Sequence, residues 1–330
     1  MKRSLSTLGT ATLLTTGIFL TSCGSDAGTG DGGGEGPVKI GISQLMDIEA
    51  LDDTREGFIK GMSENGYPEG EGVEYDYQNA QGDQATATQI AAGFASSDLD
   101  LVFAIATPAA QSVAQAVGNI PVVFSAVTEP VEAGIVESWD APGANITGTS
   151  NLGPVEDQIA LIKELAPEAK TIGVVYSSGE VNSRVQVDLA REAAEELGME
   201  LKEAAISATS EVQQAAQSLD VDALYVPTDS HVVAAIDSVV EAAETKQIPL
   251  VVGDSASVEA GGVATYGLDY EQLGYQTALM AIKILEGEDP AGMPVEKQTE
   301  SLLVLNKSAA ARMGVTLPQD MLDAADTVID

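Results

Sequence analysis

Short apolar runs alternate with amphipathic segments along most of the chain. The apolar runs are rich in valine, isoleucine and leucine, which predicts β-strands. They lie at residues 38–43, 72–80, 99–106, 120–127, 170–177, 199–206, 221–227 and 248–253. The segments between them carry apolar residues at helical spacing, and the predicted helices include 52–65, 84–96, 154–165, 182–197 and 231–246. Almost wholly apolar strands separated by helices predict α/β architecture, with parallel sheets covered by helices on both faces.

The eight strands fall into two series of four, which predicts two doubly wound lobes. The series is interrupted by a segment rich in glycine, asparagine and threonine at 142–154. Residues 262–274, followed by a helix to about residue 286, and residues 301–306 are predicted as further crossings between lobes. The expected N-terminal lobe is 38–145 plus 269–290, and the expected C-terminal lobe is 146–268 plus 300–330. Several crossings predict a hinge that bends without unfolding either lobe.

The first 36 residues do not follow this pattern. A basic start and a short apolar stretch predict a signal peptide at residues 1–22. Leu20-Thr21-Ser22-Cys23 resembles the bacterial lipobox, so Cys23, the only cysteine, is the expected lipid attachment site. The alternative is an ordinary signal peptide with an incidental cysteine. The glycine-rich remainder of residues 23–36 is typical of a flexible tether.

Charge and residue usage exclude several function classes. The chain has 51 acidic and 15 basic residues and a formal net charge of −36, which argues against nucleic acid as a partner. One histidine and one cysteine do not support a zinc site, and no phosphate-binding glycine motif follows a strand. His231 lies too close in sequence to Asp229 and Ser230 for a dispersed catalytic triad. A calcium site made of carboxylates is left open, although the chain has no EF-hand spacing. We therefore expect no metal, no cofactor and no enzymatic activity.

Candidate binding residues follow the predicted strands. In open α/β sheets, ligands bind beyond the carboxyl ends of the strands. Each such residue taken alone also has a structural interpretation, because Thr107 before Pro108, or Thr228 to Ser230, could simply cap a helix. Together they indicate one cleft between the lobes. The candidates are Gln44, Leu45, Thr107, Pro108, Ala109, Thr128 and Glu129 in the first lobe, and Asn182, Thr228, Asp229 and Asp254 in the second.

The chemistry of these candidates suits a zwitterion. Helix starts offer free N–H groups that hold a carboxylate. Asp229 and Asp254 could hold an ammonium group through charge-assisted hydrogen bonds.

Several segments carry a family resemblance. They are "ALDDTREGFIKGMSENGY", "YDYQNAQGD", "AIATPAAQSVAQ", "IPVVFSAVTEPVEAGIV", "PGANITGTS", "IGVVYSSGEVNS", "YVPTDS" and "GLDYEQLGYQTALMAIKILEGEDP". The chain is similar over nearly all of its mature length to bacterial ABC-transporter substrate-binding proteins, in the family that includes tryptophan- and aromatic amino-acid-binding lipoproteins. The resemblance implies a type I periplasmic-binding-protein fold. It also implies polar ligand contacts at Thr107, Thr128, Asn182, Thr228 and Asp229, with Asp254 less secure.

Two positions depart from the family pattern. Ile48-Glu49 stand where the family usually has His-Pro, and Glu129 stands where it usually has aspartate. Both lie near the expected cleft, so they bear on which ligand is bound. Leu45, Met46 and Ile48 could form an apolar wall for a ligand side chain or could pack under the first helix.

These observations predict a monomeric receptor on the extracytoplasmic face of a bacterial cell membrane, anchored through a lipid on Cys23. It would bind an aromatic or branched amino acid and deliver it to an ABC permease with its ATPase subunits. One alternative is a surface-tethered hydrolase or lyase with Asp229 or Glu129 as base. Others are a receptor for a nucleoside or sugar, or a sugar-responsive repressor, whose N-terminal DNA-binding motif would have to lie where the leader is.

Overall fold

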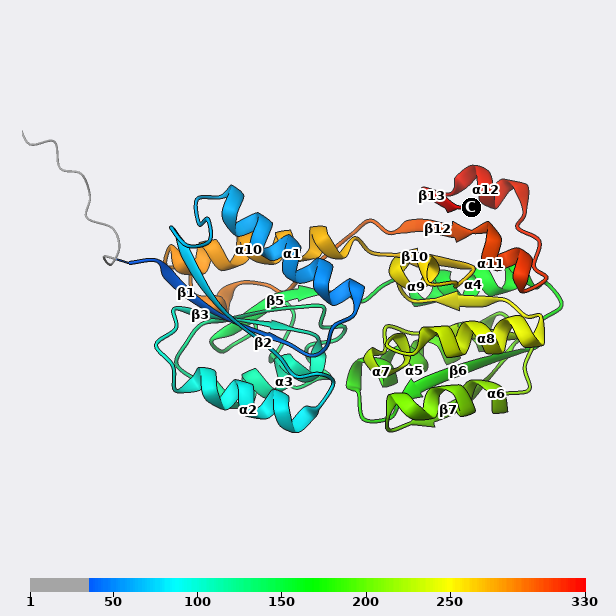
Figure 1. Ribbon diagram of the computed structural model, residues 1–330, viewed down its shortest axis with the longest axis horizontal. Helices are drawn as coiled ribbons and strands as arrows, with labels where there is room; N and C mark the ends of the chain where they lie inside the picture. Colours follow the sequence, from blue (N-terminus) through cyan, green and yellow to red (C-terminus); the bar gives the residue numbers. More distant parts are fainter. Residues whose placement is uncertain (1–35) are drawn as a thin grey trace, which may run out of the picture. The chain divides into compact units, whose positions relative to one another are not determined.

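The computed structural model describes residues 36–330 (Figure 1). The predicted signal peptide, Cys23 and all but the last residue of the tether lie outside the described residues. Among the described helices, none has the combination of length and apolarity needed to cross a bilayer.

The first lobe is built on a six-stranded sheet in the order β11-β5-β4-β3-β1-β2, in which every neighbouring pair is parallel. Helices α1 and α10 pack together on one face, and α2 and α3 lie on the other (Figure 1). The strands are β1 (Val38–Gln44), β2 (Val73–Asn79), β3 (Leu101–Ile105), β4 (Val122–Ser125), β5 (Ile146–Ser150) and β11 (Glu296–Lys297). The helices are α1 (Glu49–Glu64), α2 (Gln84–Ala95), α3 (Thr107–Ala116), α10 (Tyr270–Leu285) and the short 3₁₀ helix Pro290–Gly292.

The second lobe is built on a seven-stranded sheet in the order β13-β12-β10-β9-β8-β6-β7. Its pairs are parallel except β10 with β12. The strands are β6 (Thr171–Ser177), β7 (Glu200–Ile206), β8 (Ala223–Val226), β9 (Leu250–Val252), β10 (Ala264–Gly267), β12 (Leu302–Asn306) and β13 (Thr327–Ile329). The helices are α4 (Val155–Leu165), α5 (Val181–Glu196), the 3₁₀ turn Thr209–Glu211, α6 (Val212–Ser218), α7 (Ser230–Val233), α8 (Ile236–Lys246), α9 (Ser255–Glu259), α11 (Lys307–Arg312) and α12 (Gln319–Ala324).

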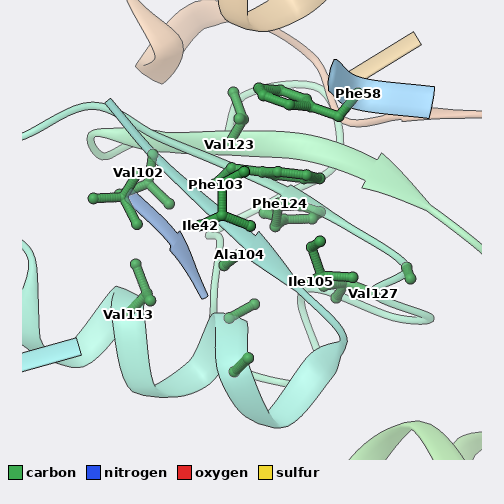
Figure 2. Close-up of a cluster of buried hydrophobic side chains, with 14 of the residues drawn as sticks. Ile42, Phe58, Val102, Phe103, Ala104, Ile105, Val113, Val123, Phe124 and Val127 are labelled. Atoms are coloured by element: carbon green, nitrogen blue, oxygen red, sulfur yellow. The ribbon is translucent and has the colours of Figure 1, made fainter. Parts of the chain in front are cut away.

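Each sheet has its own hydrophobic core. All five residues of β3 are buried, as expected for a central strand covered on both faces. Figure 2 shows part of this first core, where the rings of Phe58 and Phe103 stack with centroids 4.1 Å apart. Burial of one such large apolar side chain contributes about 1.5 to 3 kcal/mol. The cores therefore fix the strand ends that frame the cleft.

Two glycines allow α1 and α10 to touch. A Cβ atom on Gly57 would lie 1.9 Å from the carbonyl oxygen of Glu271, and one on Gly274 would lie 1.9 Å from that of Thr54. No larger residue fits either position without separating the helices. This contact holds the N-terminus of α10, and with it Tyr270, against the first lobe.

The predicted α/β class with two mostly parallel sheets is confirmed, and four details need correction. Strand β5 lies inside the segment predicted as a crossing and pairs with β4, so the expected boundary at residue 145 cuts it from its own sheet. Strand β10 likewise lies inside the second predicted crossing, and β12 occupies the third. Their sequences, ITGTS, ATYG and LLVLN, are short, and the first two are too polar to resemble the other strands.

The chain passes between the sheets just beside these strands, at residues 151–154, 268–269 and 298–301. The helix predicted at 231–246 is also two helices. Ala235, with φ −126° and ψ 29°, interrupts it.

Candidate functional site

A pocket lies where the carboxyl ends of both sheets meet. It contains about 390 Å³ of space between atoms, including its opening. Both lobes line it, as the strand-end argument predicted. The first lobe contributes Ile48, Ala50, Leu51, Ala106, Thr107, Ala126, Thr128, Asn151 and Tyr270, and the second contributes Asn182, Thr228, Asp229, Ser230, Val233 and Asp254.

The first-lobe wall contains two alanines in conformations that favour glycine. Ala106, after β3, has φ 81° and ψ 152°, and Ala126, after β4, has φ 56°. Such conformations cost of order 1–3 kcal/mol for residues other than glycine and persist where the surroundings impose them. Both alanines line the pocket. Two of the four described non-glycine residues with positive φ therefore lie where these strands reach the site.

Thr107 presents an unused hydroxyl group. It is 2% exposed, and its Oγ1 has no hydrogen-bond partner. The interpretation of Thr107 as a helix cap is wrong, because Ala106 occupies the N-cap position and no side chain caps α3. The first helical bond runs from the N–H of Ala110 to the carbonyl of Ala106, and Pro108 has no N–H. The N–H groups of Thr107 and Ala109 thus lack helical partners, and Thr107, which lines the pocket, brings its hydroxyl to the pocket wall.

Across the pocket, Asn182 presents an unused acceptor. Its Nδ2 donates to Glu180 Oε2 at 3.0 Å and to the carbonyl oxygen of Thr228 at 3.1 Å. Neither partner is a donor when Glu180 is ionised, so the amide nitrogen must face them and Oδ1 must point away. That Oδ1 is buried without a partner. A buried acceptor of this kind requires a donor from a ligand or from water.

Asp229 is fully buried, and both of its oxygens are already bonded. Oδ2 accepts from the N–H of Ser177 at 2.5 Å and from Ser183 Oγ at 2.6 Å. Oδ1 accepts from the N–H of Val232 at 2.9 Å, which makes Asp229 the cap of α7. Asp229 therefore ties three segments together in addition to lining the pocket.

Asp254 accepts fewer hydrogen bonds from the protein than Asp229 does. Its two oxygens accept one bond each from Ser257, from the N–H at 2.8 Å and from Oγ at 2.9 Å. Each carboxylate oxygen can accept more than one bond, so capacity remains on both. Burial raises the pKa of Asp254, the Ser257 bonds oppose this, and the charge of Glu49 adds to it. An added cation would stabilise the carboxylate.

A chain of hydrogen bonds connects further pocket residues. Thr128 Oγ1 donates to Asn151 Oδ1 at 3.2 Å, and Asn151 Nδ2 donates to the hydroxyl of Tyr270 at 3.0 Å. Burial raises the pKa of Tyr270, which keeps its hydroxyl protonated. On the other lobe, the Thr228 hydroxyl exchanges hydrogen bonds with the amide of Gln186. These bonds fix the pocket's polar side chains before any ligand arrives.

Five sequence candidates lie outside the pocket: Gln44, Leu45, Pro108, Ala109 and Glu129. Gln44 Nε2 donates to Asp52 and its Oε1 accepts from Arg55, at 2.9 and 2.7 Å. The Glu129 carboxylate accepts from the indole N–H of Trp139 and from the N–H of Glu132. Leu45 and Ala109 belong to the first hydrophobic core, and Pro108 is a buried residue of α3.

Sequence reasoning missed several lining residues. Asn151 and Tyr270 follow β5 and β10, the strands that were taken for crossings. The strand-end rule would have found both, had those strands been recognised. Ala106, Ala126 and Val233 carry no polar signal. Of the three residues considered for an apolar wall, Ile48 lines the pocket, whereas Leu45 and Met46 do not.

Metal ligation has no support in the described part of the chain. Residues 36–330 contain no cluster of three or more histidine, cysteine, aspartate or glutamate side chains placed to hold an ion.

The two mostly parallel sheets have the type I periplasmic-binding-protein architecture. Residues 39–329 match the family model described as ABC transporter substrate binding protein, and the chain belongs to that family. Its members are extracytoplasmic binding proteins, not enzymes. They take up small molecules and work with an ABC permease.

Two relatives illustrate the match. The chain is 42% identical to the tyrosine-binding protein of Clostridioides difficile strain R20291 over 271 residues, which cover 82% of this chain and 79% of the relative. It is 35% identical to a solved ABC domain in complex with L-Trp from Streptococcus pneumonia. That match has a TM-score of 0.86 and covers 89% of this chain and all of the other.

A third solved structure is also similar to this chain. A ligand-free, open substrate-binding protein with adhesive properties from Clostridium difficile is 42% identical, covering 88% of this chain and 99% of its own. Its TM-score is only 0.69, lower than that of the less identical tryptophan complex.

Proposed function

We propose that this protein is a lipid-anchored receptor that closes on an aromatic amino acid and delivers it to an ABC permease. The observation that carries the proposal is the pair of unused, buried polar atoms, Thr107 Oγ1 and Asn182 Oδ1, which belong to opposite lobes and line one pocket. A ligand that satisfies both atoms must bridge the lobes. Binding would then shift the hinge equilibrium toward closure, because only the closed form offers both contacts.

The two walls suit the two ends of an amino acid. Donors at the start of α3 fit a carboxylate, whose charge is also favoured at a helix N-terminus. Asn182 Oδ1 and the spare capacity of Asp254 fit an ammonium group. The described pocket residues include two carboxylates and no lysine or arginine, which favours a ligand that brings its own positive charge.

The apolar part of the pocket and the relatives point to an aromatic side chain. Ile48, Leu51, Ala126 and Val233 offer apolar surface, and the hydroxyl of Tyr270 is already engaged by Asn151. One relative is named tyrosine-binding protein, and another was solved in complex with L-Trp. Aromatic rings bury large apolar areas, so such a surface contributes much of the affinity.

A ligand screen tests this proposal. Purified mature protein would be melted with each amino acid, with common nucleosides and with sugars. A ligand at about 100 times its dissociation constant stabilises the folded state by about 2.7 kcal/mol. We expect the largest melting shifts with tryptophan, tyrosine or phenylalanine. Shifts confined to sugars or nucleosides would contradict the ligand class, and the absence of any shift would contradict the receptor itself.

The anchor has its own test. Replacing Cys23 with serine removes the expected lipid attachment site while leaving residues 36–330 unchanged. We expect the variant to leave the membrane fraction of a bacterial host and the wild type to remain there. Membrane retention of Cys23→Ser would contradict lipid anchoring without affecting the binding proposal.

A further inference from the structure

Glu180 is a buried carboxylate just behind the pocket wall. It is 5% exposed and occupies the N-cap position of α5 without capping the helix through its side chain. Oε2 accepts from Asn182 Nδ2 at 3.0 Å, from the N–H of Ser230 at 3.3 Å and from Ser230 Oγ at 3.2 Å. Oε1 is buried without a partner. Both residues that Glu180 holds, Asn182 and Ser230, line the pocket.

No cation compensates this charge in the described contacts. Asp229 lies across from it on the loop after β8, and burial together with the charge of Asp229 raises the pKa of Glu180 to about 7. Arg184, one turn along α5, directs its guanidinium to the carbonyl of Ser178 instead. His231, next to Ser230, has its Nδ1 3.3 Å from Thr209 Oγ1.

Val181, beside Glu180, packs against the first-lobe core. A buried carboxylate next to a second one is costly unless a positive charge approaches. A cation on the pocket side would therefore stabilise the negative charge at this wall.

We propose that Glu180 is a specificity-determining residue that makes the pocket select ligands carrying an ammonium group, acting through Asn182 and Ser230. Its acceptor oxygen fixes the Asn182 amide with Oδ1 toward the ligand, so that the pocket offers an acceptor there and not a donor. Its charge adds an attraction for a cation that a neutral group at the same position would not feel. This inference rests on the proposed function and assigns one part of its selectivity.

Glu180→Gln tests the assignment with little change in shape. A glutamine can keep an acceptor oxygen on Asn182 and Ser230 but has no charge. The probes are two pairs, tryptophan with indolepropionate and tyrosine with hydroxyphenylpropionate, in which the second member lacks the ammonium group. We expect calorimetry on the wild type to show a strong preference for the amino acids. In the variant, that preference should shrink at least tenfold, with the loss on the amino-acid side.

The matched control is Glu195→Gln, an exposed glutamate on the same helix. It should leave the preference unchanged. If Glu180→Gln weakens the amino acid and its desamino partner equally, Glu180 is merely structural and the inference is wrong. If the wild type binds tryptophan or tyrosine and the variant keeps the full preference, the inference is also wrong, while the proposed function stands. If the wild type binds neither tryptophan nor tyrosine, both the inference and the proposed function are wrong.

A second measurement needs no variant. A bound ammonium group favours ionised Glu180, so protonation of Glu180 competes with binding. Wild-type affinity should therefore fall as the pH drops below about 7, where Glu180 takes up a proton. Above that pH the affinity should level off until the ligand's own amine titrates. A flat profile between about pH 5 and pH 8 would overturn the inference, even if the Glu180→Gln variant fails to fold.

Discussion

The two walls of the pocket differ in how their polar groups are bonded. The first-lobe wall has strained alanines, an unused threonine hydroxyl and free helix amides, and its described lining residues include no charged side chain. The second-lobe wall has two buried carboxylates that already bond to the protein, and a third directly behind it. The donors of the first lobe are therefore available to a ligand, whereas the carboxylates of the second lobe also bond to the protein itself.

Asp229→Ala should have the largest effect, because it breaks both roles at once. It removes the cap of α7 and leaves the N–H of Ser177 and the hydroxyl of Ser183 without their acceptor. We expect stability to fall by roughly 3 kcal/mol and ligand binding to be lost. Urea denaturation of variant and wild type measures the difference, and an unchanged midpoint would show that the three bonds contribute little.

Asp254→Asn should separate the roles that Asp229 combines. The amide oxygen can still accept from the N–H of Ser257, so the α9 cap survives. Burial raises the pKa of Asp254, which means that the carboxylate is disfavoured in the fold above its unfolded pKa. At neutral pH, stability should hold or rise, while affinity for an aromatic amino acid falls at least tenfold. Calorimetry measures the affinity of the variant, and a melting curve measures its stability. A loss of stability without a loss of affinity would remove Asp254 from the ammonium site.

Thr107→Val should have a smaller effect. It should hold or raise the stability of the ligand-free protein and lower its affinity for the ligand. The hydroxyl bonds to nothing in the described structure, so replacing it with a methyl group should leave the ligand-free protein equally or more stable. Binding should weaken by roughly 0.5 to 1.5 kcal/mol, since the α3 amides remain. Thr128→Val is the matched comparison, because Thr128 already bonds to Asn151. Equal affinities for wild type and Thr107→Val would remove Thr107 from the site.

Ala106→Gly should have the smallest effect. Glycine relieves the cost of φ 81°, while it adds freedom to the unfolded chain. The net expectation is a stabilisation of about 1 kcal/mol, or a melting shift of a few degrees. A lower melting temperature would show that Ala106 is not strained.

The sequence predicted the lobes because their central strands are almost wholly apolar. It failed at β5 and β10, where threonine and glycine fill short strands that only pairing with neighbours stabilises. Such strands have no periodic signal of their own.

The site was predictable to the extent that strand ends converge. Thr107, Thr128, Asn182, Thr228, Asp229 and Asp254 all line the pocket. Gln44 and Glu129 also follow strands, but local partners turn their side chains elsewhere. The direction of a side chain depends on tertiary neighbours such as Arg55 and Trp139, which no strand-end rule includes. The same limit applies to Glu180, whose importance appears only once its partners are known.

The most direct test of the account is a crystal structure of the mature protein with bound L-tryptophan or L-tyrosine. The account predicts the ligand between the lobes, with its carboxylate at Thr107 and the first amides of α3, and its ammonium group within hydrogen-bonding distance of Asn182 Oδ1 or the Asp254 carboxylate. A ligand bound in the reverse orientation, or outside this pocket, would contradict the assignment of the carboxylate to the first-lobe wall and of the ammonium group to the second-lobe wall.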